Sequence, residues 1–260
     1  MIAVDRVAPD NALRNILRRV PPNSVLYYPG LDWANWHSNT ILDYSGRRNN
    51  GTISGAVQKR LPSGLWYLDY DGTDDYVSCA DVADWDLGTG DFTLLCWFRN
   101  DANYVAATND GRRLICAGPY VVGGTSWNWG HGWHAGWNGQ GNPCYNFVSF
   151  QGNPIVAEDK NSSTIASMNT TGVWMCGGLS MIGGTLNFFH NGAAQGTGVT
   201  ARSLDCSALG LLVGARYNDG VGARIEFHNG GLDLKGLVKG VGWTAARHKD
   251  WYNGMKPYFV

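Results

Sequence analysis

Two neighbouring segments, one alternating apolar and polar side chains and the other carrying an apolar, aromatic run, constrain the fold more than any other feature of the chain. Residues 68–77 read Leu-Asp-Tyr-Asp-Gly-Thr-Asp-Asp-Tyr-Val, and residues 90–99 carry the run Phe-Thr-Leu-Leu-Cys-Trp-Phe. A period of two residues is typical of a strand with one covered face, and Asp-Gly marks a turn. We therefore predict two neighbouring strands, with Tyr76 and Trp97 lining the inside of two stacked sheets.

The composition favours the same class of fold. The 260 residues include 36 glycines and 12 tryptophans; glycine disfavours long helices, and large aromatic residues favour pleated, half-buried surfaces. A chain of this length forms one large β-domain as readily as two small ones. Short strand-like segments recur at close spacing, as in a sandwich: residues 25–29, 113–117, 145–150, 163–168, 174–181, 185–190, 211–216 and 237–243.

The first two segments resemble the laminin-G-like, concanavalin A-type jelly-roll family, in which an Asp-Gly-Asp-Tyr strand precedes a strand built on Phe-Thr-Leu-Trp. Residues 186–192, Leu-Asn-Phe-Phe-His-Asn-Gly, resemble a hairpin of this family, since Asn-Gly favours the positive φ of a tight turn. The resemblance covers about residues 25–251. It implies an all-β, two-sheet antiparallel jelly-roll sandwich at residues 24–260, preceded by an N-terminal arm at residues 1–23.

A short amphipathic helix is predicted in this arm, at residues 10–20. Asp10 is a suitable N-cap, Pro21 and Pro22 end the helix, and apolar residues recur at helical spacing between them: Leu13, Ile16, Leu17 and Val20. A helix of this length is marginal alone and needs a partner surface for its apolar stripe. Two alternatives stay open, because the stripe either packs on the outside of the sandwich or docks on another protein.

Charge and hydropathy argue against two classes of partner. The formal net charge of −1 gives no general attraction to nucleic acid or to anionic lipid. No apolar run reaches the about 20 residues that span a bilayer, and residues 1–22 lack the hydrophobic core of a signal peptide. We expect synthesis in the cytoplasm, with no nucleic-acid partner and no membrane.

The cysteines are spaced too widely for the usual zinc-ribbon or thioredoxin-like motifs, because no C-x-x-C pair occurs. Buried free thiols are the favoured interpretation, and an even number also permits disulfides. The six cysteines are Cys79, Cys96, Cys116, Cys144, Cys176 and Cys206.

The chain lacks the carboxylate motif of the enzymes that share this architecture, so we predict that it is not an enzyme. Jelly-roll glucanases resemble one another in a strand bearing Glu, Asp and Glu, because retaining hydrolysis needs two carboxyl groups about 5 Å apart. Here the two glutamates, Glu158 and Glu226, lie far apart in the sequence. Asp74 and Asp75 are adjacent, and strand neighbours point to opposite faces, so we do not expect them to converge. A hydrolase using other aspartates is the least favoured alternative.

Neither a cofactor nor a metal site is predicted. Related domains commonly place two aspartates after the glycine of the final strand, and in many of them an acidic loop residue helps to hold calcium, but here the corresponding positions carry Lys239 and Gly240. An ammonium group opposes a bound cation that needs six to eight oxygen ligands. Asp43 and Asn50 would still offer two oxygens, although turn chemistry is the favoured interpretation of that segment.

An insertion rich in tryptophan and glycine, around residues 120–145, is the strongest candidate for a binding surface. Its tryptophans have small or polar neighbours, which suits an exposed loop or edge hairpin whose aromatic faces bind a glycan or a protein. The candidate binding residues are Trp127, Trp129, His131, Trp133, His134, Trp137 and Asn138. The alternative is that the tryptophans pack under the loop and anchor it. His131 and His134, with Cys144 as a remote third ligand, are too few for a zinc site.

The absence of both an export signal and a catalytic motif bears on function. A laminin-G-like domain that fills nearly the whole chain resembles accessory virion proteins of tailed bacteriophages, such as capsid decorations and fibre modules. The resemblance implies a non-enzymatic virion surface protein that docks on other virion proteins through its arm and binds cell-surface polysaccharide. A single aromatic site is weak, so we expect multivalent display or a homo-oligomer. A purely structural decoration protein is the alternative.

Overall fold

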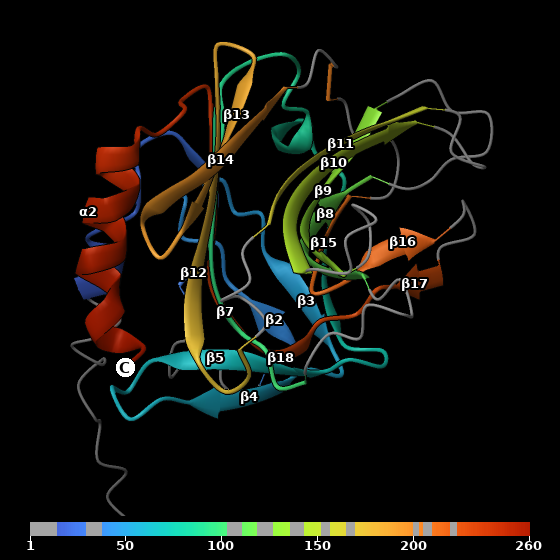
Figure 1. Ribbon diagram of the computed structural model, residues 1–260. Coiled ribbons are helices and arrows are strands. Elements are labelled where there is room, and N and C mark those ends of the chain that lie inside the picture. The colour runs from blue at the N-terminus through green and yellow to red at the C-terminus, as the bar shows by residue number, and fades with distance from the viewer. Residues whose placement is uncertain are drawn as a thin grey trace, which may run out of the picture.

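The strand-like segments form two antiparallel sheets stacked face to face, which confirms the predicted all-β sandwich (Figure 1). The computed structural model describes residues 15–29, 38–102, 111–118, 127–135, 143–151, 157–164, 170–199, 203–204, 210–218 and 223–260. Along the three strands between residues 127 and 164 it describes the backbone course and pairing. Within these ranges eight strands pair in each sheet, and two more form a separate ribbon.

The elements have the following order and bounds. Sheet A contains β14 (Ala193–Val199), β13 (Thr185–His190), β12 (Trp174–Ile182), β7 (Phe92–Arg99), β18 (Asn229–Lys239), β5 (Trp66–Asp71) and β4 (Val57–Arg60), with β1 (Ser24–Tyr28) paired to β18. Sheet B contains β11 (Ala157–Thr164), β10 (Pro143–Gln151), β9 (Trp127–Ala135), β8 (Gly111–Ala117), β15 (Leu211–Val213), β6 (Tyr76–Cys79), β3 (Gly51–Ser54) and β2 (Thr40–Ile41). The ribbon pairs β16 (Arg216–Asn218) with β17 (Ala223–Ile225), and the helical segments are η1 (Ala83–Trp85), α2 (Ala245–Met255) and η4 (Lys256–Tyr258).

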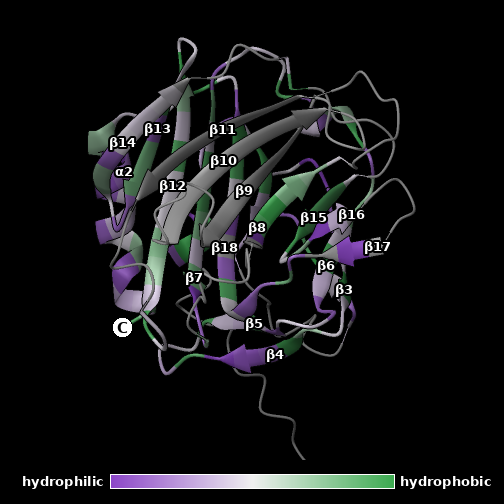
Figure 2. Cartoon of the chain, turned by 45° about the vertical axis from the view of Figure 1, so that its right-hand side comes forward, coloured by the Kyte–Doolittle hydropathy of each residue, from purple (hydrophilic) through white to green (hydrophobic). Residues whose placement is uncertain are grey.

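The inner core fills the space between the two sheets. Leu94 and Phe98 of β7 and Leu237 of β18 enter it from sheet A, and Val77 and Val213 enter it from sheet B; all five are at most 1 % exposed. Burying one such side chain is worth about 1.5–3 kcal/mol. At the edge of sheet A, β4 is largely hydrophilic (Figure 2) and mostly exposed, a composition that discourages pairing with a further strand.

A second apolar cluster lies on the opposite, outer side of sheet A, under the C-terminal helix (Figure 1). Trp97 is at its centre, with its ring centroid 4.2 Å from that of Phe259 and 5.6 Å from that of Tyr252. The prediction that Trp97 lines the inside of the sandwich is therefore wrong, because strand alternation puts it on the side opposite Phe98. Tyr76 also packs on an outer face, that of sheet B, against a small cluster that includes Leu212.

Residues 68–77 form two strands and a bend rather than one continuous strand. Gly72 adopts φ +82°, and the Thr73 amide donates to Asp71 Oδ1 at 2.7 Å, so an Asx turn ends β5. The chain then crosses to sheet B as β6, and β18 separates β5 from β7 in sheet A. The two segments are consequently not neighbouring strands, because this short bend moves the chain from one layer to the other.

Other strand predictions hold with shifted limits. The hairpin between β13 and β14 is confirmed, with Asn191 and Gly192 at φ 49° and 76°, the left-handed pair expected of an Asn-Gly turn. The final strand is β18, which ends at Lys239 rather than continuing to residue 243, because Gly240 turns the chain at φ 77°. The strand expected at residues 163–168 is instead β11, which ends at Thr164.

The N-terminal segment packs on the protein's own outer cluster where the structure describes it. The helical turn visible here covers residues 15–17, with Ile16 fully buried in the outer cluster and Val20 packed against it. Leu17 is partly buried, and Leu13 and Asp10 lie outside the described residues. Ile16 and Val20 thus make the intramolecular contacts that one of the two alternatives requires.

The C-terminal helix α2 was not foreseen from the sequence. Thr244 caps its first turn, accepting a hydrogen bond from the Arg247 amide, and the buried residues His248, Trp251 and Met255 recur at helical spacing. Within the part of the chain that is described, no helix is both long and apolar enough to cross a lipid bilayer.

A buried polar network fastens α2 to sheet A. His248 Nε2 lies 2.8 Å from Ser180 Oγ, which is 3.0 Å from Thr93 Oγ1. The imidazole stacks on Phe189 with ring centroids 3.8 Å apart. Burial, reinforced by the charge of Arg247, lowers the pKa of His248 to about 3, so the ring is neutral at physiological pH.

Four of the cysteines are confirmed as buried free thiols: Cys79, Cys96, Cys116 and Cys176. Cys96 and Cys176 sit on neighbouring strands but on opposite faces of sheet A, one in each apolar cluster. Burial raises the pKa of Cys79 to about 12 and that of Cys116 to about 11, so both thiols are protonated and unreactive. The Cys144 side chain and Cys206 lie outside the described residues.

The protein should lose stability on acidification because of buried neutral histidines. His248 binds a proton in the unfolded chain below about pH 6.5 and in the folded chain only near pH 3, so protonation favours unfolding as the pH falls between these values. Between about pH 7 and pH 5 this residue should lower the free energy of unfolding by about 2 kcal/mol. Urea unfolding of the protein and of His248→Gln measures the difference, and equal losses in both would contradict the assignment.

The packing of α2 against sheet A should be sensitive to one added methyl group. A Cβ at Gly178 would lie 2.6 Å from His248 Nδ1, whereas a Cβ at Gly90 meets nothing closer than 3.6 Å. Gly178→Ala should therefore lower the free energy of unfolding by about 1–3 kcal/mol. Gly90→Ala is the matched control and should change it by less than about 0.5 kcal/mol, as thermal and chemical unfolding will show.

Candidate functional site

Strand β9 carries five of the seven residues that the sequence proposes for binding: Trp127, Trp129, His131, Trp133 and His134. The strand pairs antiparallel with β10 on one side and with β8 on the other. The Trp- and Gly-rich segment thus forms part of a regular sheet here, where the sequence suggested a loop or an edge hairpin. Trp137 and Asn138 lie outside the described residues.

The register of β9 separates the five residues into two sets. Positions 127, 129, 131 and 133 alternate along the strand and share one side of sheet B, whereas His134 lies on the other side. Positions 129 and 131 pair with Ala117 and Ile115 of β8, which are both buried in the inner core. The three tryptophan positions of β9 therefore lie on the continuation of the inner face of sheet B.

Strands β10 and β11 extend this side of β9 into rows that mix aromatic and hydrogen-bonding residues. One row runs from Trp133 to Tyr145 and Ser163, and the next runs from His131 to Phe147 and Asn161. We call these positions the β9–β11 strip. The sequence analysis missed the members on β10 and β11, although the alternation of Tyr145 with Phe147 would have indicated them.

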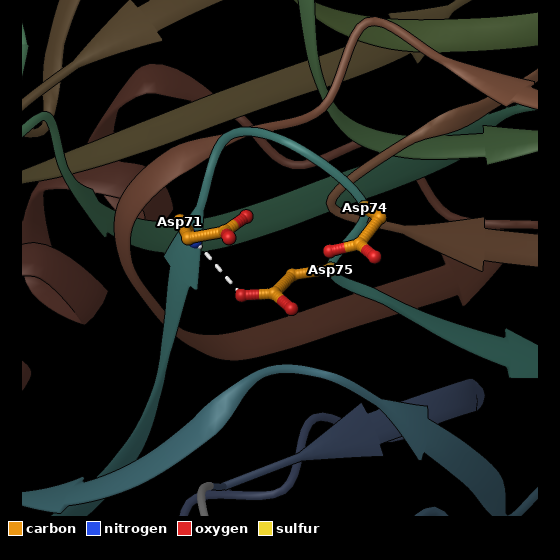
Figure 3. Close-up of side chains that lie close together, drawn as sticks. All are labelled: Asp71, Asp74 and Asp75. Carbon is orange, nitrogen blue, oxygen red and sulfur yellow. Dashed lines mark hydrogen bonds between the residues drawn. The ribbon is translucent and has the colours of Figure 1, made fainter.

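An acidic cluster forms at the bend between β5 and β6 (Figure 3). Oxygen atoms of Asp71, Asp74 and Asp75 all lie within 4.8 Å of one another. The expectation that Asp74 and Asp75 cannot converge is wrong, because both residues lie in the bend before β6 begins at Tyr76. Adjacent residues are forced to opposite faces only within an extended strand.

Asp75 is the structural member of this cluster. It is 5 % exposed, and its Oδ2 accepts a hydrogen bond of 2.8 Å from the Asp71 amide (Figure 3). Burial raises its pKa, and the neighbouring charges of Asp71 and Asp74 act in the same direction. Calcium takes six to eight oxygen ligands, whereas this cluster brings together one oxygen from each of three carboxylates. We therefore assign no metal to it.

The segment that begins at Asp43 shows the turn chemistry expected of it. Asp43 Oδ1 accepts from the amides of Tyr27 and Ser45, each at 2.9 Å. Its Oδ2 accepts from Ser45 Oγ at 2.7 Å and from the Asn49 amide at 3.0 Å, while Asn50 Oδ1 accepts from the Asp43 amide. Four donors thus converge on one carboxylate and fix the loop after β2.

Two side-chain arrangements have the composition of a catalytic site, but neither has its accessibility. Ser180 and His248 have the geometry of a nucleophile and its base, yet they are 0 % and 3 % exposed beneath α2. Glu226 is held between Arg113 Nε at 2.8 Å and Arg216 Nη2 at 2.7 Å. Burial keeps a substrate from Ser180, and the two arginines occupy the carboxylate oxygens of Glu226. Both arrangements therefore stabilise the fold.

Removing the charge of Asp75 should stabilise the protein. A raised pKa in the folded state means that the charged form is disfavoured at neutral pH, and Asp75→Asn retains an acceptor for the Asp71 amide. We expect the free energy of unfolding to rise by about 1 kcal/mol at neutral pH, and this gain should shrink at low pH, where the native carboxyl is protonated.

The matched control is Asp91→Asn, because Asp91 Oδ1 likewise accepts from a backbone amide, that of Gly183, but lies outside the acidic cluster. Its substitution should leave the free energy of unfolding within about 0.5 kcal/mol. A loss of stability in Asp75→Asn would show that its carboxylate is needed in charged form.

Comparison with known proteins finds similarity in structure alone. No protein-family model matches the chain, and no curated protein matches it in sequence. Among solved structures, the binding domain of Paraclostridial Mosquitocidal Protein 1 superposes with a TM-score of 0.59 at 12 % identity, over 89 % of this chain and 52 % of that one. A structure of botulinum neurotoxin type C, reported for cell entry dependent on two ganglioside molecules, gives 0.58 at 13 % identity, over 94 % and 53 %.

A third similar structure is of the same size as this chain. It is domain 4 of AbnA, a GH43 extracellular arabinanase from Geobacillus stearothermophilus, in complex with arabinotriose. Its TM-score is 0.57 at 13 % identity, over 88 % of this chain and 97 % of that domain. The chain spans about half the length of the two toxin structures. At these identities the likeness shows the fold: the chain has the two-sheet β-sandwich that these binding domains contain.

Proposed function

We propose that this protein is a non-catalytic carbohydrate-binding module. The observation that carries the proposal is the β9–β11 strip, where aromatic and hydrogen-bonding residues are mixed in rows across three paired strands. Two similar structures support it: AbnA domain 4 is in complex with arabinotriose, and a botulinum neurotoxin DC binding domain is in complex with SialylT.

Recognition by such a strip follows from the chemistry of a sugar ring. The C–H face of a pyranose or furanose packs on an aromatic ring such as Trp133 or Tyr145, and its hydroxyl groups exchange hydrogen bonds with residues such as Asn161. Each aromatic contact is worth about 1 kcal/mol, so one strip binds weakly and specificity comes from the polar positions. No covalent step is required.

The weak single site points to a carrier that displays many copies of the module. We propose the surface of a virion of a tailed bacteriophage, with the module in a capsid decoration, fibre or appendage protein that binds cell-surface polysaccharide. Multivalent display raises avidity by orders of magnitude without new contacts. The N-terminal arm would join the module to other virion proteins, and the part that precedes Asn15 is the segment to test, since Ile16 already packs on the domain.

Substitution on the two sides of β9 tests the glycan site. Trp133→Ala should weaken binding on a glycan array that includes arabinan oligosaccharides and sialylated glycans by about fivefold or more, because one aromatic contact is lost. His134→Ala lies on the other side of the strand and should retain binding. Trp66→Ala, a tryptophan substitution on β5 of the other sheet, is the control for general destabilisation.

Three outcomes separate the alternatives. The strip is supported if Trp133→Ala loses binding while its far-ultraviolet circular dichroism and melting temperature match those of Trp66→Ala. No binding by the native protein, together with association with purified virions that is lost on deletion of residues 1–14, would replace the glycan function by a purely structural one. Polysaccharide cleavage abolished by a single aspartate substitution would overturn the non-catalytic assignment.

A further inference from the structure

A groove on the outer side of sheet A concentrates arginine side chains. It lies between the N-terminal segment and the C-terminal helix, has a volume of about 340 Å³, and is lined by Arg18, Arg19, Val20, Pro21, Pro22, Trp243, Arg247, Asp250 and Trp251. Trp243 and Trp251 are 2 % and 7 % exposed and form its buried part, while the charged residues are exposed at its walls. We call it the arginine groove.

The three guanidinium groups of this groove have no acidic partner. No ion pair and no hydrogen bond joins the Arg18, Arg19 or Arg247 side chain to another of the residues that the structure describes, not even to Asp250 in the same groove. By contrast, Arg99, Arg113 and Arg216 form ion pairs with carboxylates elsewhere in the described chain. Three guanidinium groups that outnumber the single carboxylate of Asp250 repel one another, and an anion relieves that repulsion.

Two unsatisfied donors add to this preference for an anion. The indole Nε1 atoms of Trp243 and Trp251 are buried without a hydrogen-bond partner among the described residues, which is costly for a polar group.

We propose that the arginine groove binds a doubly charged oxyanion, with phosphate as its ligand class. Three guanidinium groups against the one carboxylate of Asp250 leave a net charge of about +2 in the lining, which a dianion neutralises. The guanidinium fork matches the oxygens of phosphate or sulfate in two-point hydrogen bonds. Stacking of a sugar ring is disfavoured, because the Arg247 guanidinium already covers Trp243, 4.3 Å from the ring centroid.

This site is independent of the proposed glycan site. The arginine groove is lined by the N-terminal segment and α2, which cover the outer side of sheet A. Strands β9–β11 belong to the other sheet (Figure 1). Phosphate held in the groove would join the N-terminal segment, through Arg18 and Arg19, to α2, through Arg247. Anion binding would therefore link the two segments that cover sheet A. The absence of glycan binding would not contradict this proposal.

Isothermal titration calorimetry on the full chain at constant ionic strength tests the proposal. Inorganic phosphate, glucose 6-phosphate, sulfate and acetate are the probes, with chloride as the background anion. Phosphate and sulfate should both bind, acetate should bind at least about tenfold more weakly, and phosphate affinity should rise from about pH 5.5 to pH 7.5 as its second proton is lost. Glucose 6-phosphate that binds as tightly as phosphate indicates an ester ligand, whereas much weaker binding indicates the free ion.

Three variants locate the binding. The double variant Arg18→Gln with Arg247→Gln should weaken phosphate binding about tenfold or more, and Asp250→Asn should strengthen it. Lys249→Gln removes one positive charge from the same helix, outside the groove lining, and should change the affinity by less than about threefold. Circular dichroism establishes that each variant is folded. Phosphate binding no tighter than that of acetate, or equal losses in Lys249→Gln and in the arginine double variant, would overturn the proposal.

Discussion

Burial of β7 on both of its faces is the constraint on which the rest of the structure depends. Leu94 and Phe98 enter the core between the sheets, and Leu95 and Trp97 enter the outer cluster. A strand in the middle of a sheet that is covered on both sides needs apolar or hydrogen-bonded side chains throughout, and Phe92–Phe98 are all buried. The outer face therefore requires a cover, which α2 and the segment around Ile16 provide.

Aromatic stacking and buried polar side chains hold that cover on sheet A. The polar side chains stabilise it only while they are uncharged or hydrogen-bonded. Trp97 stacks on Phe259, and His248 stacks on Phe189 while it contacts Ser180. Such a network specifies one position for α2 on the sheet, because Ser180 Oγ contacts both His248 of the helix and Thr93 of β7. The same burial makes the attachment of the helix dependent on pH through a single imidazole.

The fold assigns different physical tasks to its different surfaces. Sheet B continues into β9–β11, whose register places Trp129 and Trp133 on one side, and this strip carries the proposed glycan site. Sheet A is closed on its outer side, and the junction of its two covering segments gathers arginines that form no ion pair with the residues that the structure describes. The acidic bend of Asp71, Asp74 and Asp75 is separate from both surfaces and belongs to the crossing between the sheets.

Local patterns in the sequence determined the class of fold, the strands of alternating or apolar composition, and the Asn191–Gly192 turn, because each depends on residues close together in the chain. The face that Trp97 occupies, the helix α2 and the convergence of Asp74 with Asp75 were decided only by the tertiary structure. The run Phe92–Phe98 of β7 is buried on both faces, so its sequence does not distinguish the inner face from the outer one. The buried face of α2 includes His248 beside Trp251 and Met255, so its sequence shows no continuous apolar stripe. The arginine groove also joins residues 18 and 247, which no local pattern relates.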